Sequence, residues 1–302
     1  MQDESTLNGL REICPDLLVN APMKGRTTFR IGGPAQYLAL PSSAEQISRL
    51  LLFARNAGLP VTLLGNCSNV LVRDGGIDGL VLQLGSNFSK ASVTGNEVEA
   101  EAGILMSTLA QVCTRAGLAG FEFASGIPGS LGGGVYMNAG AYNGEIGSIV
   151  KSVTVINERL ELVTLSREEM GFAYRHTALS GRDVAVVSAV LSLSPDNPQD
   201  IAARVADFTR RRRERQPLNY PSAGSVFKRP EGAFAAALID TAGLKGVSVG
   251  GAQVSCKHAG FFVNTGGATA ADVLALINLV QNTVYEKSGF RLEPEIKIIG
   301  HD

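Results

Sequence analysis

Residues 124–142 read Ala-Ser-Gly-Ile-Pro-Gly-Ser-Leu-Gly-Gly-Gly-Val-Tyr-Met-Asn-Ala-Gly-Ala-Tyr, and this stretch decides the fold. It has six glycines, little charge and several hydroxyl or amide groups. Glycine lets a ligand approach the main chain closely, because it has no side chain in the way. Glycine-rich low complexity is the alternative, but the ordered apolar residues between the glycines argue against disorder. The stretch therefore favours a backbone cradle for a pyrophosphate or a flavin.

A second polar turn lies upstream, at Gly65-Asn66-Cys67-Ser68-Asn69. It joins an expected buried strand at 61–64 to another apolar run. The backbone N–H groups and the Ser or Asn side chains of such a turn can hold phosphate oxygens. It matches neither the Walker A pattern nor Gly-x-Gly-x-x-Gly, so it indicates a different nucleotide fold. A tight structural turn is the alternative interpretation.

Composition narrows the class of protein. The chain has 302 residues, of which 45% are hydrophobic and 18% charged, and this is enough for two or three packed domains. A net charge of −1 gives no basic field, so we expect no nucleic-acid partner. Four widely spaced cysteines suggest neither a metal site nor a disulfide framework, and they favour a reducing, cytoplasmic compartment. No apolar run is long enough for a membrane span, and no obligate protein partner is evident.

The hydrophobic pattern predicts a mixed chain of helices and strands. We expect three domains at residues 1–90, 91–195 and 196–302, the last border lying in the turn-rich segment 194–198. Helices are expected at 7–18, from a cap at Ser42 or Ser43 to Gly58, at 107–116, 199–215 and 233–242, and from a cap at Thr269 to Gly289. Strands are expected at 36–40, 61–64, 79–84, 92–101, 149–156, 184–193 and within 292–299.

A candidate reactive serine lies in the stretch 220–230, Tyr-Pro-Ser-Ala-Gly-Ser-Val-Phe-Lys-Arg-Pro. The small residues before Ser225 let its side chain stand clear of its own backbone, with the chain free to approach a ligand. Lys228 and Arg229 follow closely and suit a phosphate or a carboxylate. An ordinary polar turn is the alternative.

Other charged features are also open to a structural interpretation. Arg175 is flanked by aromatic residues and is either a ligand-binding cation or a solvated charge. The five arginines within 210–215 suit either an anionic ligand or the C-terminus of a helix. Glu293 and Glu295 share one face of the expected last strand unless Pro294 disturbs it, and each is either a surface carboxylate or a buried acid.

Several of these stretches agree with one family in order and spacing. They are Gly65-Asn66-Cys67-Ser68-Asn69, Gly126-Ile127-Pro128-Gly129-Ser130, Asn138-Ala139-Gly140-Ala141-Tyr142, Tyr174-Arg175, Gln216-Pro217, Ser222-Ala223-Gly224-Ser225-Val226-Phe227-Lys228 and Leu292-Glu293-Pro294-Glu295. In this ordered set the chain resembles the UDP-N-acetylenolpyruvoylglucosamine reductase (UDP-N-acetylmuramate dehydrogenase, MurB) family from about residue 20 to the C-terminus. It resembles the shorter type, because the segment after Tyr174-Arg175 has no room for the substrate-covering tyrosine loop of the longer type.

The resemblance implies an α+β fold. Two FAD-binding subdomains of the vanillyl-alcohol oxidase type (PCMH-like) would precede an α+β substrate-binding domain. FAD is expected to be non-covalent, because none of the three histidines lies in the two cofactor loops, and NADPH is the implied co-substrate. The cofactor-binding residues that the resemblance implies are Gly65, Asn66, Cys67, Ser68, Asn69, Ile127, Pro128, Gly129, Ser130, Gly133, Asn138, Ala139, Gly140 and Arg212.

The resemblance also implies a reaction, the reduction of UDP-N-acetylglucosamine enolpyruvate to UDP-N-acetylmuramate in peptidoglycan precursor synthesis. Hydride would pass from reduced flavin to the enolpyruvyl methylene, and Ser225 would give a proton to the adjacent carbon. Arg175 and Glu295 would stabilise the enolate. The substrate-binding residues implied are Tyr174, Lys228, Arg229, Lys245 and His258. Two alternatives stay open: another FAD-dependent oxidoreductase of the same fold acting on a different sugar or alcohol, and an inactive flavin- or nucleotide-sugar-binding module.

Overall fold

The structure, a computed structural model, describes residues 2–302 and divides the chain into two compact units. Unit 1 comprises Met1–Leu18, Tyr37–Asn66 and Gly79–Arg212, and unit 2 comprises Val19–Gln36, Cys67–Asp78 and Arg213–Asp302. Each unit is therefore assembled from segments that are far apart in the sequence.

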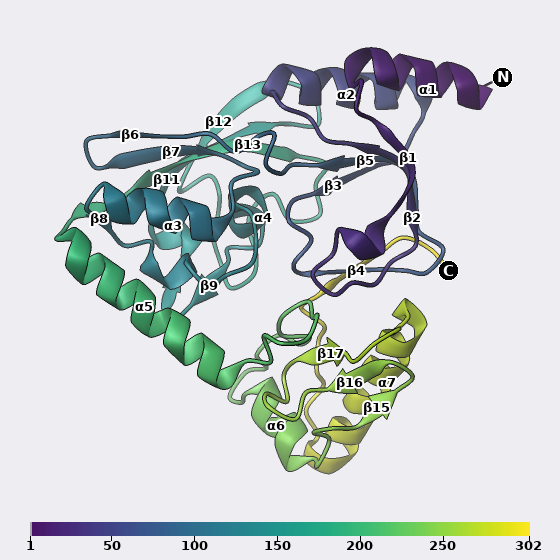
Figure 1. The fold of residues 1–302 in the computed structure, drawn as a ribbon, viewed down its shortest axis with the longest axis vertical. Helices are drawn as coiled ribbons and strands as arrows, with labels where there is room; N and C mark the ends of the chain where they lie inside the picture. The colour runs from purple at the N-terminus through teal and green to yellow at the C-terminus, as the bar shows by residue number, and fades with distance from the viewer. Residues whose placement is uncertain (1) are drawn as a thin grey trace. The chain divides into compact units, whose positions relative to one another are not determined.

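The helices of unit 1 begin and end at local signals in the sequence. The hydroxyl of Ser43 accepts a hydrogen bond from the backbone N–H of Gln46 at 3.1 Å, which caps α2, and Gly58 ends this helix in the left-handed conformation (φ 64°). Figure 1 shows α2 lying beside α1. The helices are α1 (Gln2–Ile13), α2 (Ala44–Ala57), α3 (Met106–Arg115), α4 (Leu131–Tyr136) and α5 (Pro198–Arg215), the last of which extends three residues beyond the unit.

Strands of two sheets contribute to unit 1. A four-stranded sheet has the order β1-β2-β5-β3, and β3 runs parallel to β5. A five-stranded sheet has the order β12-β11-β13-β7-β6, and its neighbouring strands are antiparallel. The strands are β1 (Leu18–Pro22), β2 (Pro34–Ala39), β3 (Val61–Leu64), β5 (Ile77–Gln83), β6 (Ala91–Thr94), β7 (Glu97–Glu101), β11 (Val150–Ile156), β12 (Leu162–Ser166) and β13 (Ala185–Ser192). Of these, β1 except Leu18 and the first residues of β2 and β5 are counted with unit 2.

Short elements complete unit 1. β8 (Leu118–Ala119) pairs with β14 (Ser194–Pro195), and β9 (Gly140–Ala141) pairs with β10 (Gly144–Glu145). Two 3₁₀ turns, η2 (Glu122–Ala124) and η3 (Ile146–Ser148), flank the glycine-rich stretch.

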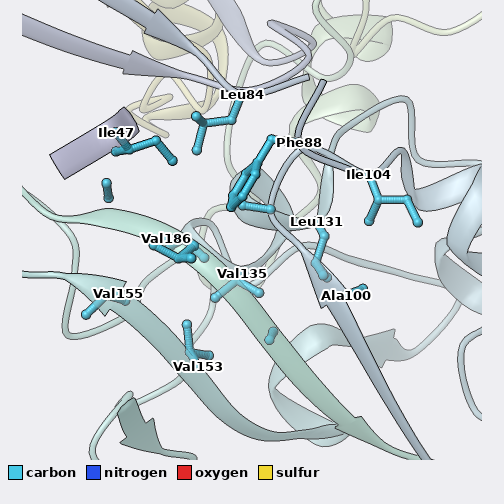
Figure 2. Packing of buried hydrophobic residues seen from close by; sticks show 14 of the residues in the cluster. Ile47, Leu84, Phe88, Ala100, Ile104, Leu131, Val135, Val153, Val155 and Val186 are labelled. Carbon is cyan, nitrogen blue, oxygen red and sulfur yellow. The ribbon is translucent and has the colours of Figure 1, made fainter. Parts of the chain in front are cut away.

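The core of unit 1 is packed around the five-stranded sheet. Figure 2 shows Val153, Val155 and Val186 from this sheet, with Leu131 and Val135 of α4 lying against the same cluster. The alternation of buried valines along β11 is what a strand with one face on a core requires. Because α4 is part of this core, the glycine-rich stretch that contains it is held on a rigid base.

Unit 2 has its own hydrophobic core. A three-stranded sheet of β15 (Ser248–Val249), β16 (Ala252–Val254) and β17 (Phe262–Asn264) packs with α6 (Ala235–Thr241) and α7 (Ala270–Ser288). β4 (Val70–Val72) pairs in parallel with β18 (Lys297–Ile299), and the 3₁₀ turn η1 (Met23–Gly25) follows β1. Thr269 and Asp272 form a capping box at the start of α7, and Gly289 ends that helix at φ 74°.

Most expected elements are confirmed to within a few residues, and the differences have local causes. The N-terminal helix spans Gln2–Ile13 and not 7–18, because Pro15 has no N–H for a helical hydrogen bond. Residues 92–101 form two strands, β6 and β7, since Gly95 takes φ 58° and turns the chain back into a hairpin.

Two further differences lie next to the candidate sites. Residues 131–136 form α4, although three consecutive glycines disfavour a helix. The final strand is confined to 297–299, because Pro294 lacks the N–H that a continuous ladder needs.

None of the helices described within residues 2–302 has the length and apolar character needed to cross a membrane.

Candidate functional site

The first half of the 65–69 turn and the start of the glycine-rich stretch lie together in unit 1. The side-chain amide of Asn66 donates a hydrogen bond to the carbonyl oxygen of Pro128. A Cβ on Gly65 would lie 2.1 Å from Ser130 Oγ, so glycine allows the two loops to approach with the serine in this rotamer. The structure thus brings together four of the predicted cofactor-binding residues.

The three consecutive glycines of α4 have different surroundings. A Cβ on Gly132 would lie 2.8 Å from the Cβ of Ala102, and one on Gly134 would lie 2.9 Å from Cε of Met106. These two glycines therefore permit close packing of α4 on the core. Gly133 is exposed, and a Cβ there would meet nothing closer than 3.8 Å. Its bare backbone leaves the outer face of α4 open to a ligand.

Two serine hydroxyls in the glycine-rich stretch are buried without a partner. Within the described chain, neither Ser125 Oγ nor Ser130 Oγ has a hydrogen bond. Leaving a buried hydroxyl unsatisfied costs about 1–3 kcal/mol, and such groups are rare in folded proteins. An oxygen-rich ligand at this loop would accept both hydrogen bonds, so the hydroxyls fit the diphosphate of FAD.

Arg212 of α5 is a half-buried cation beside the same stretch. A Cβ on Gly126 would lie 3.0 Å from Arg212 Cδ and 3.5 Å from its Nη1. Burial lowers the pKa of the guanidinium, and nearby Tyr142 opposes this shift. No carboxylate pairs with Arg212 in the part of the chain that the structure describes. A buried charge without a counter-ion is costly, so the side chain is suited to an anionic ligand.

A two-residue turn places Arg175 at a corner of unit 1. Ala173 and His176 exchange backbone hydrogen bonds of 3.0 and 3.1 Å, and Tyr174 and Arg175 are the residues between them. Arg175 has φ 53°, which is unusual for a residue with a side chain. Its guanidinium lies 5.1 Å from the centre of the exposed Tyr174 ring, within cation–π range.

The loop after α4 supports this arginine. Its guanidinium donates to the carbonyl oxygens of Asn138 and Gly140 at 3.4 and 3.3 Å. The buried side chain of Asn138 donates to the carbonyl of Ala173 at 2.9 Å and accepts from the N–H of Gly147 at 2.8 Å. Asn138 and Gly140, predicted to contact the cofactor, thus also position the Arg175 turn.

In unit 2, Ser225 and Glu295 lie on neighbouring extended segments. Ser225 forms an isolated bridge with Phe261, and the N–H of Glu295 donates to the carbonyl of Val226 at 2.7 Å. Gly224 has φ 78°, so glycine is required there by the backbone conformation. The structure therefore brings two of the three predicted catalytic residues together, although 70 positions separate them in the sequence.

The second half of the 65–69 turn lies beside Glu295 in unit 2. Cys67 is buried and left-handed (φ 49°), and its carbonyl accepts from the N–H of Thr28 at 3.3 Å. The side-chain amide of Asn69 donates to the carbonyl of Glu295 at 3.3 Å, and the N–H of Lys297 donates to the carbonyl of Asn69 at 2.9 Å. The turn and the catalytic segment are thus linked directly.

The predicted substrate-binding cations of unit 2 already have partners. Lys228 pairs with Glu293, and Lys245 pairs with Asp240 at 2.6 Å. Arg229 lies over the exposed ring of Phe234, at 4.0 Å from its centre. These pairs are solvent-exposed and weak, so an anionic substrate can compete for both lysines.

His258 is half-buried near the Ser225 segment. Its Nδ1 accepts from the N–H of Gly260 at 3.2 Å, so the neutral ring carries its proton on Nε2. Burial lowers its pKa, and the charge of Lys245 acts in the same direction against a backbone hydrogen bond that raises it. The side chain is therefore a neutral donor at physiological pH.

The sequence interpretation missed Ser125 and Tyr142 as candidate cofactor-site residues. Both residues stand in the glycine-rich stretch quoted at the start, with Tyr142 as its last residue. Their burial and contacts depend on packing, for which the sequence carries no local signal.

Comparison with known proteins places this arrangement in one family. Residues 35–166 match the FAD binding domain model, and residues 216–299 match the UDP-N-acetylenolpyruvoylglucosamine reductase, C-terminal domain model. A UDP-N-acetylenolpyruvoylglucosamine reductase from Caldanaerobacter subterraneus subsp. tengcongensis is 47% identical over 98% of this chain and 99% of the relative. One from Pediococcus pentosaceus is 46% identical over the full length of both chains. The chain belongs to the UDP-N-acetylenolpyruvoylglucosamine reductase family.

Solved structures agree with this membership. The UDP-N-acetylenolpyruvylglucosamine reductase of Thermus caldophilus superposes with a TM-score of 0.81 at 35% identity, covering 94% of this chain and 98% of that one. Phl p 4.0202, a glucose dehydrogenase, superposes at 0.50 with 17% identity over 64% of this chain and 44% of its own, which shows a shared fold alone. The expected fold class, a PCMH-like FAD-binding fold with a C-terminal α+β domain, is confirmed for this member of the reductase family.

Proposed function

We propose that the chain reduces UDP-N-acetylglucosamine enolpyruvate to UDP-N-acetylmuramate in peptidoglycan precursor synthesis, using non-covalent FAD and NADPH. The full-length similarity to reductases of that name supports this most strongly. The unpartnered Ser125 and Ser130 hydroxyls and the half-buried Arg212 cation provide independent support for a bound anionic cofactor.

The cofactor site would be built from backbone, hydroxyls and one cation. Ser125 and Ser130 would donate to oxygens of the FAD diphosphate, and the open backbone face at Gly133 would lie against it. Arg212 would neutralise part of the diphosphate charge or contact the flavin. When bound, FAD supplies the capacity to accept hydride from NADPH and deliver it to the substrate.

Arg175 would hold the substrate through its carboxylate. Reduction of an enolpyruvyl ether adds hydride to the methylene carbon, and negative charge then develops on the adjacent carbon and spreads into the carboxylate. A guanidinium can grip that carboxylate with two N–H groups, so it stabilises the charge as it forms. The two hydrogen bonds that Arg175 makes to loop carbonyls are long and therefore weak, so a substrate carboxylate can compete for these two donors.

Ser225 would complete the reaction by giving its hydroxyl proton to the adjacent carbon, which balances the added hydride. A serine hydroxyl is a weak acid and protonates only a strongly basic carbon, so water must then replace the proton. Glu295 lies on the segment next to Ser225 and would assist either as a protonated donor or by orienting one. Lys228, Arg229, Lys245 and His258 would bind the UDP diphosphate.

Anaerobic half-reactions test this proposal. NADPH should bleach the flavin absorbance of the purified protein, and UDP-N-acetylglucosamine enolpyruvate should restore it. In Ser225→Ala, bleaching by NADPH should stay near the wild-type rate, while reoxidation by substrate should slow by orders of magnitude. A flavin that the substrate does not reoxidise would favour another oxidoreductase of this fold. Equal losses in both half-reactions would assign Ser225 a structural role.

A further inference from the structure

One face of α5 makes three contacts along the glycine-rich stretch (residues 124–142) and the 3₁₀ turn that precedes it. Arg204, Phe208 and Arg212 are spaced four residues apart, so they lie on the same side of the helix. All three are half-buried. Figure 1 shows α5 passing below β8, the short strand before the glycine-rich stretch, and below β9, which lies within it.

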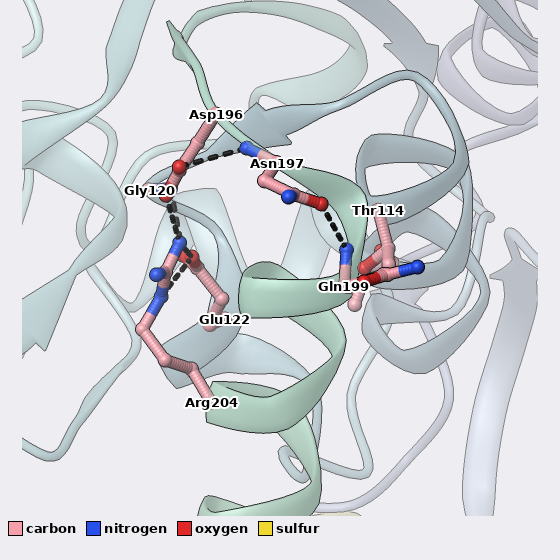
Figure 3. A network of polar contacts seen from close by, with 8 residues as sticks. Thr114, Gly120, Glu122, Asp196, Asn197, Gln199 and Arg204 are labelled. Atoms are coloured by element: carbon pink, nitrogen blue, oxygen red, sulfur yellow. Dashed lines mark hydrogen bonds and ion pairs between the residues drawn. The ribbon is translucent and has the colours of Figure 1, made fainter.

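Arg204 ties the helix to the 3₁₀ turn that precedes the stretch. Its Nε donates to Glu122 Oε1 at 2.9 Å, and its Nη2 donates to Asp196 Oδ2 at 2.5 Å. The carboxylate of Glu122 is buried, and its other oxygen accepts from the N–H of Gly120 at 2.6 Å. Figure 3 shows Arg204 between the two carboxylates. Removing the half-buried Arg204 would leave the buried Glu122 carboxylate without its counter-ion, so this contact fixes the first half of α5.

Phe208 ties the next turn of α5 to the end of the stretch. Its ring stacks on Tyr142, with centroids 4.5 Å apart and planes 8° apart, and the Tyr142 hydroxyl donates to the carbonyl of Phe208 at 3.1 Å. Tyr142 itself has φ 51°, and Asn143 has φ 66°. These left-handed residues cost energy in isolation, so the stacking contact stabilises an otherwise unfavourable loop conformation.

Arg212 is the last residue of this face, beside Gly126. Its guanidinium has no carboxylate partner within the described residues, in contrast to Arg204. The first two contacts thus hold α5 along the glycine-rich stretch, and Arg212 presents a half-buried cation to it.

We propose that Arg204 and Phe208 are positioning residues that fix Arg212 against the cofactor loop, where it binds an anionic group of FAD. This inference rests on the proposed flavin function. In this proposal neither residue contacts the cofactor itself, and Arg204 acts on the affinity for FAD through the placement of Arg212.

Arg210 provides a matched control on the same helix. It lies two residues from Phe208, so at about 100° per residue it points to the far side of α5. Its side chain is 60% exposed and pairs with Asp207 at 2.5 Å. Arg210→Gln therefore removes an arginine of α5 without touching the face that contacts the glycine-rich stretch.

A double-mutant cycle on the full-length protein tests the inference, with FAD as the probe and fluorescence quenching as the measure of its dissociation constant. Arg212→Ala should weaken FAD binding by about 10- to 100-fold, the range for a lost hydrogen bond to a charged group. Arg204→Gln should weaken it by about 10-fold, and Arg210→Gln by less than about 2-fold. Because Arg204 acts through Arg212, the double variant should bind FAD no more weakly than Arg212→Ala alone.

Additive effects in the double variant, or an Arg204→Gln that matches Arg210→Gln, would overturn the inference. If Arg204→Gln does not yield folded protein, Phe208→Leu, which preserves most of the apolar volume, takes its place in the cycle under the same criteria. A wild-type chain that binds no FAD would overturn the proposed function together with this inference. If the wild-type chain binds FAD but the effects of the two substitutions add in the double variant, this inference alone is overturned.

Discussion

At the scale of single residues, Arg175 combines an unfavourable backbone conformation with its proposed role in holding the substrate carboxylate. A left-handed conformation costs a residue with a side chain about 1–2 kcal/mol, and glycine adopts it freely. The turn at φ 53° nevertheless carries arginine, with its guanidinium held by two loop carbonyls. Such strain is concentrated at functional sites, where the surrounding structure imposes it.

Arg175→Gly should therefore separate stability from activity. Relief of backbone strain should leave the free energy of unfolding unchanged or up to about 1 kcal/mol higher. Loss of the carboxylate contact should lower turnover by about 100-fold or more. Arg30 is a matched control, because it is also a left-handed arginine (φ 55°) and belongs to none of the proposed sites. Urea unfolding and steady-state kinetics of both variants decide the matter: a comparable fall in turnover for Arg30→Gly would contradict the specific role.

At the scale of elements, α4 shows how packing overrides local preference. Glycine disfavours a helix by about 1 kcal/mol per residue relative to alanine, yet three glycines occupy α4. Gly132 is required because Ala102 approaches too closely for a side chain, and Gly134 lies against the flexible end of Met106. The third, Gly133, has no such steric reason, so its bare face is best explained by a ligand.

Two alanine substitutions in α4 should have opposite effects. Gly132→Ala places its Cβ 2.8 Å from that of Ala102, so it should lower the free energy of unfolding by about 1–3 kcal/mol. The Cβ of Gly133→Ala meets nothing closer than Ser130 Oγ at 3.8 Å, so this substitution should raise the free energy of unfolding by up to about 1 kcal/mol while weakening FAD binding. Chemical unfolding of the FAD-free protein and FAD titration measure the two effects. Unchanged FAD affinity in Gly133→Ala would exclude this face as part of the cofactor site.

The same element explains what the sequence could and could not predict. The ends of α2 and α7 follow from caps at Ser43 and Thr269, since capping is local and visible in the sequence. The helix α4 was missed because its stability comes from contacts with distant residues. The adjacency of Ser225 and Glu295 likewise depends on pairing between segments far apart in the chain, and only the family resemblance indicated it. The residue roles and the three-domain division remain predictions.

At the scale of the whole molecule, each unit has its own hydrophobic core, and the core of unit 1 encloses a titratable thiol. Cys113 of α3 lies in the core of unit 1 and is 2% exposed. Burial raises the pKa of its thiol from 9.0 to about 12, and the charge of Glu122 contributes in the same direction, against a backbone hydrogen bond that lowers it. The folded protein therefore keeps a proton on Cys113 over a pH range in which the unfolded chain has lost it.

This difference predicts that stability falls as the solution becomes alkaline. Between pH 9.0 and about 12 the folded state binds one more proton at Cys113 than the unfolded state, so the free energy of unfolding decreases as pH rises. A single such group contributes about 1.4 kcal/mol per pH unit. Urea unfolding across this pH range should show that the free energy of unfolding declines more steeply for the wild type than for Cys113→Ala. All other titrating groups are the same in the two proteins, so the difference in slope reports Cys113. Parallel declines in the two proteins would mean that the Cys113 thiol ionises freely in the folded state.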